Sequence, residues 1–419
     1  GQWGDEGKGK IVDYFSASAD IVARYQGGAN AGHTVYIDEE QFVLHQIPSG
    51  ILSPGTRCLM GTGMVIDPVA LAEEIKSLNE RGIQCTDQVG IAYNAHLVLP
   101  VHRTLDGISE EDSRDKTIGT TRRGIGPAYT DRSARRGVPV GAMLDPDGFR
   151  DAVHRHLDYS NAIIVNVYNQ PPLEYDEFSD SLEEAREIIL PMITDVAQEL
   201  LDALTAEKHI ISEGAQGVLL DVDFGSYPYV TSSHPGTAGI SAGLGVPPRA
   251  VSRSTGIFKA YCTRVGEGPF PTELTDATGE RLREAGGEYG ATTGRPRRCG
   301  WFDAILGKYS AGLNGFTDLC ITKADVLDGF PEISLCTAYG ETDTAFLDLQ
   351  NLDNVQSRYE TYTGWETGIA DVTSYDEFPG EFKTYIGAIE TALDTPVSLV
   401  STGPERTELI ARPLDDHPA

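Results

Sequence analysis

The sequence predicts an α/β fold with a large central, mostly parallel sheet and helices on both of its faces. Short apolar runs alternate with helical stretches along the 419 residues, which is the order typical of such sheets. Several of these runs lead directly into polar or glycine-rich turns, as expected where ligands bind at the carboxyl ends of strands. No linker, repeat or low-complexity segment divides the chain, so we expect one large domain over residues 1–419 with peripheral subdomains.

The first half of the chain contains several extended segments and one well-marked helix. Asp67 can cap that helix and Pro68 fits its first turn, after which apolar residues recur at helical spacing up to Gly82. The predicted extended segments are residues 21–25, 42–44 and 89–99.

The second half continues the alternation. Ser181 and Glu184 form a capping-box pattern before a long amphipathic helix that reaches Leu204, and Pro191 is expected to break or kink this helix. Apolar strands are predicted at residues 209–211, 319–321 and 398–400. The acidic region 341–379 is less periodic, and we expect it to be peripheral.

The first ten residues form a loop rich in glycine and lysine. Such glycines let backbone N–H groups approach an anion, and lysines add charge for phosphates. Gly7 and Lys8 match the second half of the phosphate-loop pattern, but Gln2 and Gly9 replace its first glycine and its hydroxyl residue. Since that hydroxyl normally binds Mg²⁺, Asp5 is the near candidate to hold a metal or to take a proton.

This loop makes the predicted fold P-loop-NTPase-like. We also expect a strand ahead of the loop in the complete protein, because phosphate loops normally follow a strand. A glycine-rich turn with solvated charges remains the alternative interpretation of these ten residues.

The net charge is −30, from 63 acidic and 33 basic side chains. Such a surface repels nucleic acid and anionic membranes, and no apolar run is long enough to span a bilayer. Because the acids are spread along the whole chain, we expect a protein adapted to a salty cytoplasm. The six cysteines are scattered without disulfide or metal-binding spacing, and several lie in apolar runs, which fits a reducing compartment.

Two segments of the first half carry candidate chemistry. Residues 26–34 follow a predicted strand and contain His33, which can donate a proton or polarise an oxygen. A hydrogen-bonded structural histidine is the alternative. Residues 118–127 are glycine-rich and basic, and Arg135 and Arg136 follow closely, so we expect an anion site, with ordinary surface salt bridges as the alternative.

Four segments of the second half add candidates. Gln216 offers a donor and an acceptor for a base edge, residues 227–233 can contact a phosphate, and residues 290–298 carry three arginines suited to clamp carboxylates or phosphates. The alternative is that Gln216 is a buried structural residue and that the hydroxyls of residues 227–233 only stabilise a turn, since the sequence pattern would be the same. The run from Thr322 to Asp325 resembles the [NT]-K-x-D element of guanine-binding proteins, in which the aspartate accepts two donors that adenine lacks. Residues 401–403 also follow a strand and can complete a base pocket.

Taken in order, eight segments closely resemble the adenylosuccinate synthetase family. They run from Gly1 to about Arg412 and read QWGDEGKGK, NAGHT, IGTTxRGIGPAY, EGAQGxLLD, YPYVTSS, ATTGRxRR, TKxD and STGPxRTE. The resemblance implies a ligase of AMP biosynthesis with one Mg²⁺ per subunit. It would join IMP and L-aspartate, convert GTP to GDP and phosphate, and form adenylosuccinate through a 6-phosphoryl-IMP intermediate.

The resemblance also implies roles for individual residues. Asp5 would be the catalytic base and, with the carbonyl of Gly32, a magnesium ligand, while His33 would be the acid that stabilises the transferred phosphoryl group. Lys8 and Gln216 complete the implied catalytic set. The implied binding residues are, for IMP, Asp5, Asn30, Thr121, Arg135, Gln216, Thr231 and Arg295; for aspartate, Thr292, Thr293, Gly294, Arg295 and Arg297; and for GTP, Gly4, Asp5, Glu6, Gly7, Lys8, Gly9, Lys10, Gly32, His33, Thr34, Arg297, Lys323, Asp325, Ser401, Thr402 and Gly403.

In the family, the arginine at the position of Arg135 reaches IMP from the partner subunit, so a cytoplasmic homodimer is implied. Arg122 and Pro296 depart from residues common in the family, at positions without assigned chemistry. Two alternatives stay open. One is a GTP-binding switch that regulates a partner, which would have no use for His33 and residues 292–298. The other is a catalytically dead nucleotide-binding relative, against which Asp5, His33 and Lys8 argue.

Overall fold

Two mostly parallel sheets form the centre of the molecule. The computed structural model describes residues 1–37, 40–112, 117–290, 294, 296–340, 349 and 351–412. One sheet is entirely parallel, with the order β8-β6-β4-β1-β9, and the other has the order β10-β14-β17-β18 with only its last pair antiparallel. Their strands are β1 (Ile21–Arg24), β4 (Arg57–Met60), β6 (Val89–Ala92), β8 (Ile193–Thr194), β9 (Ile210–Glu213), β10 (Thr255–Lys259), β14 (Asp318–Thr322), β17 (Val397–Ser401) and β18 (Leu409–Ala411).

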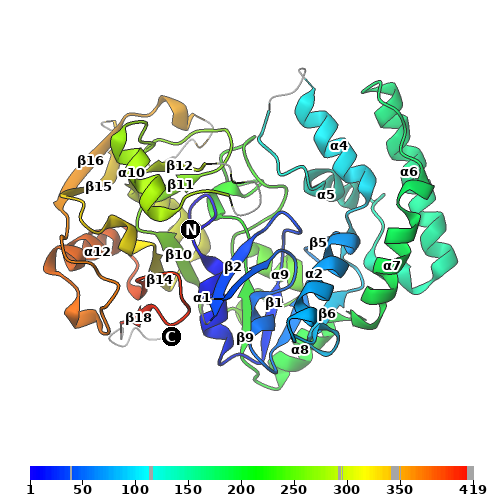
Figure 1. Cartoon of the computed structure of the whole chain (residues 1–419), viewed down its shortest axis with the longest axis horizontal. Coiled ribbons are helices and arrows are strands. Elements are labelled where there is room, and N and C mark those ends of the chain that lie inside the picture. Colours follow the sequence, from blue (N-terminus) through cyan, green and yellow to red (C-terminus); the bar gives the residue numbers. More distant parts are fainter. Residues whose placement is uncertain are drawn as a thin grey trace.

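The first residues of the chain lie between the two sheets (Figure 1). The amino group of Gly1 donates to the carbonyl of Ile257 in β10 at 2.6 Å, and Nε2 of the Gln2 side chain donates to the carbonyl of Lys259 at 3.3 Å. On the other side, the N–H of Leu219, in the segment after β9, donates to the carbonyl of Gln2 at 3.1 Å. The glycine-rich loop is thereby placed at the carboxyl ends of strands from both sheets.

Helices cover both sheets, and small sheets complete the periphery (Figure 1). The helices are α1 (Lys8–Ser16), α2 (Pro68–Glu80), α3 (Cys85–Gln88), α4 (Pro100–Glu111), α5 (Ile125–Ser133), α6 (Pro146–Asn166), α7 (Ser179–Ile189), α8 (Val196–Thr205), α9 (Ala238–Leu244), α10 (Ala277–Gly286), α11 (Ala304–Asn314) and α12 (Gly380–Leu393). The smaller strands are β2 (His33–Ile37), β3 (Glu40–Leu44), β5 (Val65–Ile66), β7 (His96–Leu97), β11 (Cys262–Arg264), β12 (Arg298–Gly300), β13 (Phe302–Asp303), β15 (Glu332–Tyr339) and β16 (Ser357–Thr363). The predicted fold class is confirmed.

Two large apolar clusters hold these layers together. One surrounds the five-stranded sheet and includes Leu59, Leu71 and Ile91, and the other surrounds β10, β14 and β17 and includes Phe258 and Phe382. All six cysteines are buried and unpaired, as their apolar surroundings predict. Among the described residues, no helix is both long enough and apolar enough to cross a bilayer.

The predicted helix after Asp67 is confirmed as α2. The Asp67 side chain accepts the N–H of Ala70 at 3.1 Å, Pro68 is the first helical residue, and Gly82 follows the helix with a φ of 83°. The segment 89–99 is not one strand, because β6 ends at Ala92 and β7 begins only at His96.

The single long helix predicted up to Leu204 is wrong in its extent. Helix α7 already begins at Ser179, and the hydroxyl of Ser181 donates to the carbonyl of Phe178 at 2.9 Å instead of forming a capping box. Pro191 lies in a 3-10 turn after α7, since it lacks the N–H that an α-helix needs. The two residues of β8 then pair with β6, and α8 starts afresh with Asp195 as its cap.

Candidate active site

A cavity of about 1450 Å³ opens at the carboxyl ends of the strands. It brings together most of the residues predicted from the sequence, although they are spread from residue 4 to residue 403. Those in its wall are Gly4, Asp5, Gly7, Lys8, Gly9, Lys10, Asn30, Gly32, His33, Thr34, Thr121, Gln216, Thr231, Arg297, Lys323, Asp325, Ser401 and Gly403.

The remaining predicted residues lie elsewhere. Glu6 and Thr402 are buried outside the wall of the cavity, and Arg135 is exposed on the surface with a φ of 62°. Gly294 has a φ of 64° and does not line the cavity. Thr292, Thr293 and Arg295 lie outside the described residues.

The glycine-rich loop needs the residues it has. Gly4, Asp5 and Gly7 all have left-handed φ values, of 90°, 60° and 78°, which favour glycine. The loop leads directly into α1, whose first residue is Lys8 and which therefore presents its N-terminus to the cavity. Free N–H groups and the positive end of the helix dipole make this a place for phosphate oxygens.

Glu6 does not face the cavity, although it lies between two residues that do. Its fully buried carboxylate accepts the N–H groups of Gln2 and Gly4 at 3.0 and 2.9 Å and pairs with the ammonium of Lys8. Burial alone would raise the pKa of Glu6, but Lys8 and the N-terminal ammonium hold it well below its ordinary value. Its side chain therefore stabilises the loop, and only its backbone can contact a phosphate.

Asp5 has the opposite environment. Its side chain is 38% exposed and lies in the cavity wall. Its one ion pair among the described residues is with Arg297, whose Nε lies 2.8 Å from Oδ2. A carboxylate that is this accessible can take a proton or hold a cation.

His33 is paired with a residue that the sequence analysis did not select. Its Nδ1 lies 2.5 Å from Oε1 of Glu213, and the N–H and hydroxyl of Ser49 donate to the same carboxylate at 2.8 and 2.9 Å. Burial lowers the pKa of His33, and Glu213 opposes that shift. With Nδ1 engaged, Nε2 is the ring nitrogen left for a ligand. The signal for Glu213 was its place at the end of β9, three residues before Gln216.

Several buried polar atoms in the cavity wall have no hydrogen-bond partner among the described residues. They include Oδ1 of Asn30, both amide atoms of Gln216, Oδ1 of Asp325 and Nε1 of Trp3. Buried polar atoms are nearly always hydrogen-bonded to protein, water or a ligand, so these atoms are candidates to contact a bound molecule. Asn30, Gln216 and Asp325 are the predicted contacts to the two nucleotides.

Lys10 in the wall is held by one hydroxyl and two backbone carbonyls. The ammonium of Lys10 donates to Ser401 Oγ at 2.9 Å and to the carbonyls of Gly403 and Glu408 at 2.7 and 2.9 Å, which occupies all three of its donors. Burial lowers the pKa of Lys10 to about 8. Lys10 therefore ties α1 to the loop after β17.

Beside the cavity, His102, Asp131 and His156 join α4, α5 and α6. Oδ2 of Asp131 lies 2.8 Å from Nε2 of His156 and 3.3 Å from Nε2 of His102. Because Nδ1 of His102 accepts the N–H of Leu99 at 2.9 Å, Nε2 carries the proton and donates to Asp131. A metal on that nitrogen would need the proton on Nδ1, so the group is a hydrogen-bond network between helices.

Comparison with known proteins identifies the family of this chain. The family model of adenylosuccinate synthetase matches residues 1–410. The chain is 50% identical to the adenylosuccinate synthetase of Salinibacter ruber and 46% identical to that of Desulforamulus reducens, in each case over 98% of this chain and 96% of the relative. It is also similar to the fully ligated adenylosuccinate synthetase of Plasmodium falciparum, with a TM-score of 0.92 and 36% identity over 98% of both chains. The chain therefore belongs to the adenylosuccinate synthetase family, the ligases that form a C–N bond between IMP and aspartate with GTP in AMP synthesis.

Proposed function

We propose that the ligation takes place in this cavity in two steps, and that Asp5 and His33 act in the first. Asp5 takes the N1 proton of IMP, so that O6 attacks the γ-phosphorus of GTP while GDP leaves. The imidazole of His33, held by Glu213, stabilises charge on the transferred phosphoryl group. In the second step the amine of aspartate displaces phosphate from the 6-phosphoryl intermediate. The observation that carries this proposal is the meeting of an accessible Asp5, the His33–Glu213 pair and unpartnered base-reading atoms in one cavity.

The substrates divide the cavity between them. The α1 N-terminus and the loop of residues 4–10 suit the phosphates of GTP, and Lys323, Asp325 and residues 401–403 suit its guanine. Asn30, Thr121, Gln216, Thr231 and Arg295 would bind IMP. Thr292, Thr293, Gly294, Arg295 and Arg297 would bind aspartate.

Asp5 and Gly32 fit a magnesium ion. Both line the cavity and offer oxygen ligands, which Mg²⁺ prefers, and a Cβ added at Gly32 would meet no atom within 4 Å, so the space beside it is open. When bound, Mg²⁺ would neutralise charge on the phosphates.

We further propose a cytoplasmic homodimer of single-domain subunits from a salt-adapted cell. The exposed position of Arg135, away from the cavity of its own chain, supports a contribution to the partner's site. The lining of one cavity by residues from Trp3 to Pro404 supports a single domain. The net charge of −30 supports adaptation to salt, because such a surface repels itself at low ionic strength.

The deciding experiment is phosphate release from GTP with Mg²⁺ in concentrated KCl, omitting IMP or aspartate in turn. We expect release only with both, together with an equal amount of adenylosuccinate. Release independent of both substrates would indicate a GTP-binding switch, and no release would indicate an inactive relative. The same assay over a KCl series tests the salt proposal, which would be wrong if activity and unfolding temperature were highest in dilute buffer.

A further inference from the structure

One group of buried charges beside the cavity has no role in the chemistry described so far. Glu288 follows α10 and is fully buried, as is Lys259 at the end of β10. The ammonium of Lys259 donates to Oε1 of Glu288 at 2.7 Å, and the hydroxyl of Tyr261 donates to the same oxygen at 2.5 Å. Lys259 is itself fixed by Thr263 Oγ1 at 2.7 Å. One oxygen of Glu288 is thus held firmly from inside the protein.

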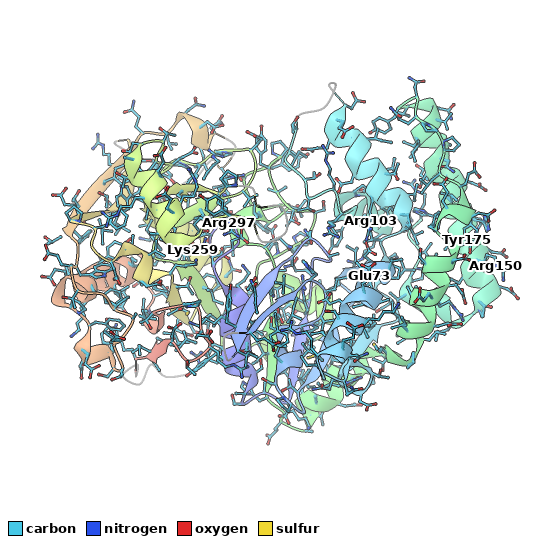
Figure 2. All side chains as sticks on the ribbon, viewed as in Figure 1. Glu73, Arg103, Arg150, Tyr175, Lys259 and Arg297 are labelled. Carbon is cyan, nitrogen blue, oxygen red and sulfur yellow. The ribbon has the colours of Figure 1, made fainter. Side chains whose placement is uncertain are left out.

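The other oxygen of Glu288 holds Arg297. Nη1 of Arg297 donates to Oε2 of Glu288 at 2.7 Å, and the N–H of Arg297 donates to the carbonyl of Glu288 at 2.9 Å. On its far side, Arg297 contacts Asp5. Charges therefore alternate from Lys259 through Glu288 and Arg297 to Asp5, and Figure 2 shows Lys259 and Arg297 close together beside α10.

Glu288 and Arg297 keep their charges at neutral pH. Burial alone would raise the pKa of Glu288, but Lys259, Lys323 and Arg297 lower it to about 2. Burial likewise works against the charge of Arg297, but Asp5 and Glu288 raise its pKa above the ordinary value. Glu288 is therefore a permanent anion beside the permanent cation of Arg297.

The turn that carries Glu288 also reaches the predicted guanine site. The ammonium of Lys323 donates to the carbonyl of Gly286 at 2.6 Å, and Gly286, Gly287 and Tyr289 line the cavity. The turn thus contacts Lys323, the lysine of the predicted guanine site, at one end and Arg297 at the other.

We propose that Glu288 is a positioning residue that holds the Arg297 guanidinium at the reaction centre, between Asp5 and the aspartate substrate. This inference rests on the proposed roles of Asp5 and Arg297. A guanidinium has five N–H donors in a fixed plane, so anchoring Nη1 sets the direction of the donors left for Asp5 and for a substrate carboxylate. Glu288 itself touches no substrate and acts through Arg297.

The test compares Glu288→Gln with Glu273→Gln. Glu273 pairs with Arg298, the next arginine along, at 2.8 and 2.5 Å, and does not line the cavity, so it is a matched control. For Glu288→Gln we expect kcat to fall about 100-fold, because the guanidinium loses its fixed direction. The KM for aspartate should rise about tenfold while the Kd of GTP stays within about twofold. Glu288→Asp should restore part of kcat, and Glu273→Gln should keep all three constants within about threefold.

Stability is controlled with a second variant. Glu288→Gln leaves the buried Lys259 without its counter-ion, so Lys259→Met with Glu288→Gln is measured as well. Kinetic constants of a folded Glu288 variant that match those of Glu273→Gln would overturn the proposal. Asp5→Ala is measured in parallel, and turnover in that variant would refute the role of Asp5 and leave the aspartate KM to decide on Glu288.

Discussion

Neighbouring acids in one loop have opposite roles because their surroundings differ. The carboxylate of Glu6 is buried and bonded to backbone N–H groups and Lys8, whereas that of Asp5 is exposed to the cavity and contacts one guanidinium. Glu213 is buried like Glu6, but it holds the imidazole of His33. At the scale of the residue, accessibility decides whether a carboxylate supports the loop, orients a neighbour or meets a substrate.

Lys10 gives a prediction about pH. Its pKa of about 8 means that the ammonium loses its proton as the pH rises from 7 to 9. Because a charged Lys10 favours the anionic GTP and ties the loop after β17, the Kd of GTP should rise across this window, by up to about tenfold if GTP raises the lysine pKa by one unit. Equilibrium titrations at several pH values check this. Lys10→Arg stays charged and should flatten the curve, and a wild-type curve that is already flat would contradict the prediction.

Asp325 gives a prediction about base specificity. Asp325→Asn replaces an acceptor by a donor, so xanthine, whose 2-oxo group accepts where guanine donates, should become the preferred base. We expect kcat/KM for GTP to fall at least about 100-fold, with that for XTP rising above it. Asp328→Asn is the control, since Asp328 bonds Trp365 and the N–H of Ile369 and does not line the cavity. Unchanged GTP kinetics in Asp325→Asn would place the guanine elsewhere.

The sequence identified the residues that carry motifs and missed those that support them. Asp5, Gln216 and Asp325 lie in glycine-rich or strand-end patterns that can be recognised in the sequence. Glu288 does not, because what distinguishes it is a buried lysine 29 residues away, Lys259. Glu213 does end a strand, but its role comes from a partner 180 residues away, His33. Such pairings are set by tertiary packing and leave no local spacing to detect.

At the scale of the element, the approach of α1 to β2 depends on Gly9. A Cβ added at Gly9 would lie 2.9 Å from the Cβ of His33, closer than side chains pack. Gly9→Ala should therefore push His33 away from Glu213 and lower kcat by about tenfold or more.

Gly107 in α4 is the matched control for this substitution. A Cβ added there meets nothing within 4 Å, so Gly107→Ala should leave kcat unchanged and stabilise the fold by about 0.5–1 kcal/mol. Phosphate release and thermal unfolding measure both variants. Equal kcat in the two alanine variants would show that the α1–β2 contact tolerates a methyl group.

Local signals also decided which elements could be predicted. The cap and proline at the start of α2 act within four residues, and that helix was predicted well. The sequence predicts the break at Pro191 but not the pairing of β8 with β6. A strand of two residues is too short to show an alternating apolar pattern, so the helical periodicity around it dominates the prediction. The division of the parallel strands into two sheets also depends on long-range pairing.

At the scale of the whole molecule, the proposed dimer leads to a complementation test. If Arg135 serves the partner's site, Arg135→Leu and Asp5→Ala subunits each lack a different part of the same site. A mixed dimer then contains one site with both parts intact, so mixing the two inactive variants should restore up to about a quarter of the wild-type rate. Phosphate release after mixing and re-equilibration measures this recovery. No recovery, with mixed dimers shown to form, would count against a shared site.

Trp3 gives the protein an optical label at the centre of its chemistry. The chain has three tryptophans, and Trp3 is the one in the cavity wall, with its ring edge-on to Phe270 and under the guanidinium of Arg264. Its Nε1 has no partner among the described residues, whereas the indole N–H of Trp365 is bonded to Asp328, and neither of these two residues lines the cavity. We therefore expect emission from Trp3 to change when ligands bind, with Trp3→Phe as the blank, so that the order in which substrates bind can be followed without a dye.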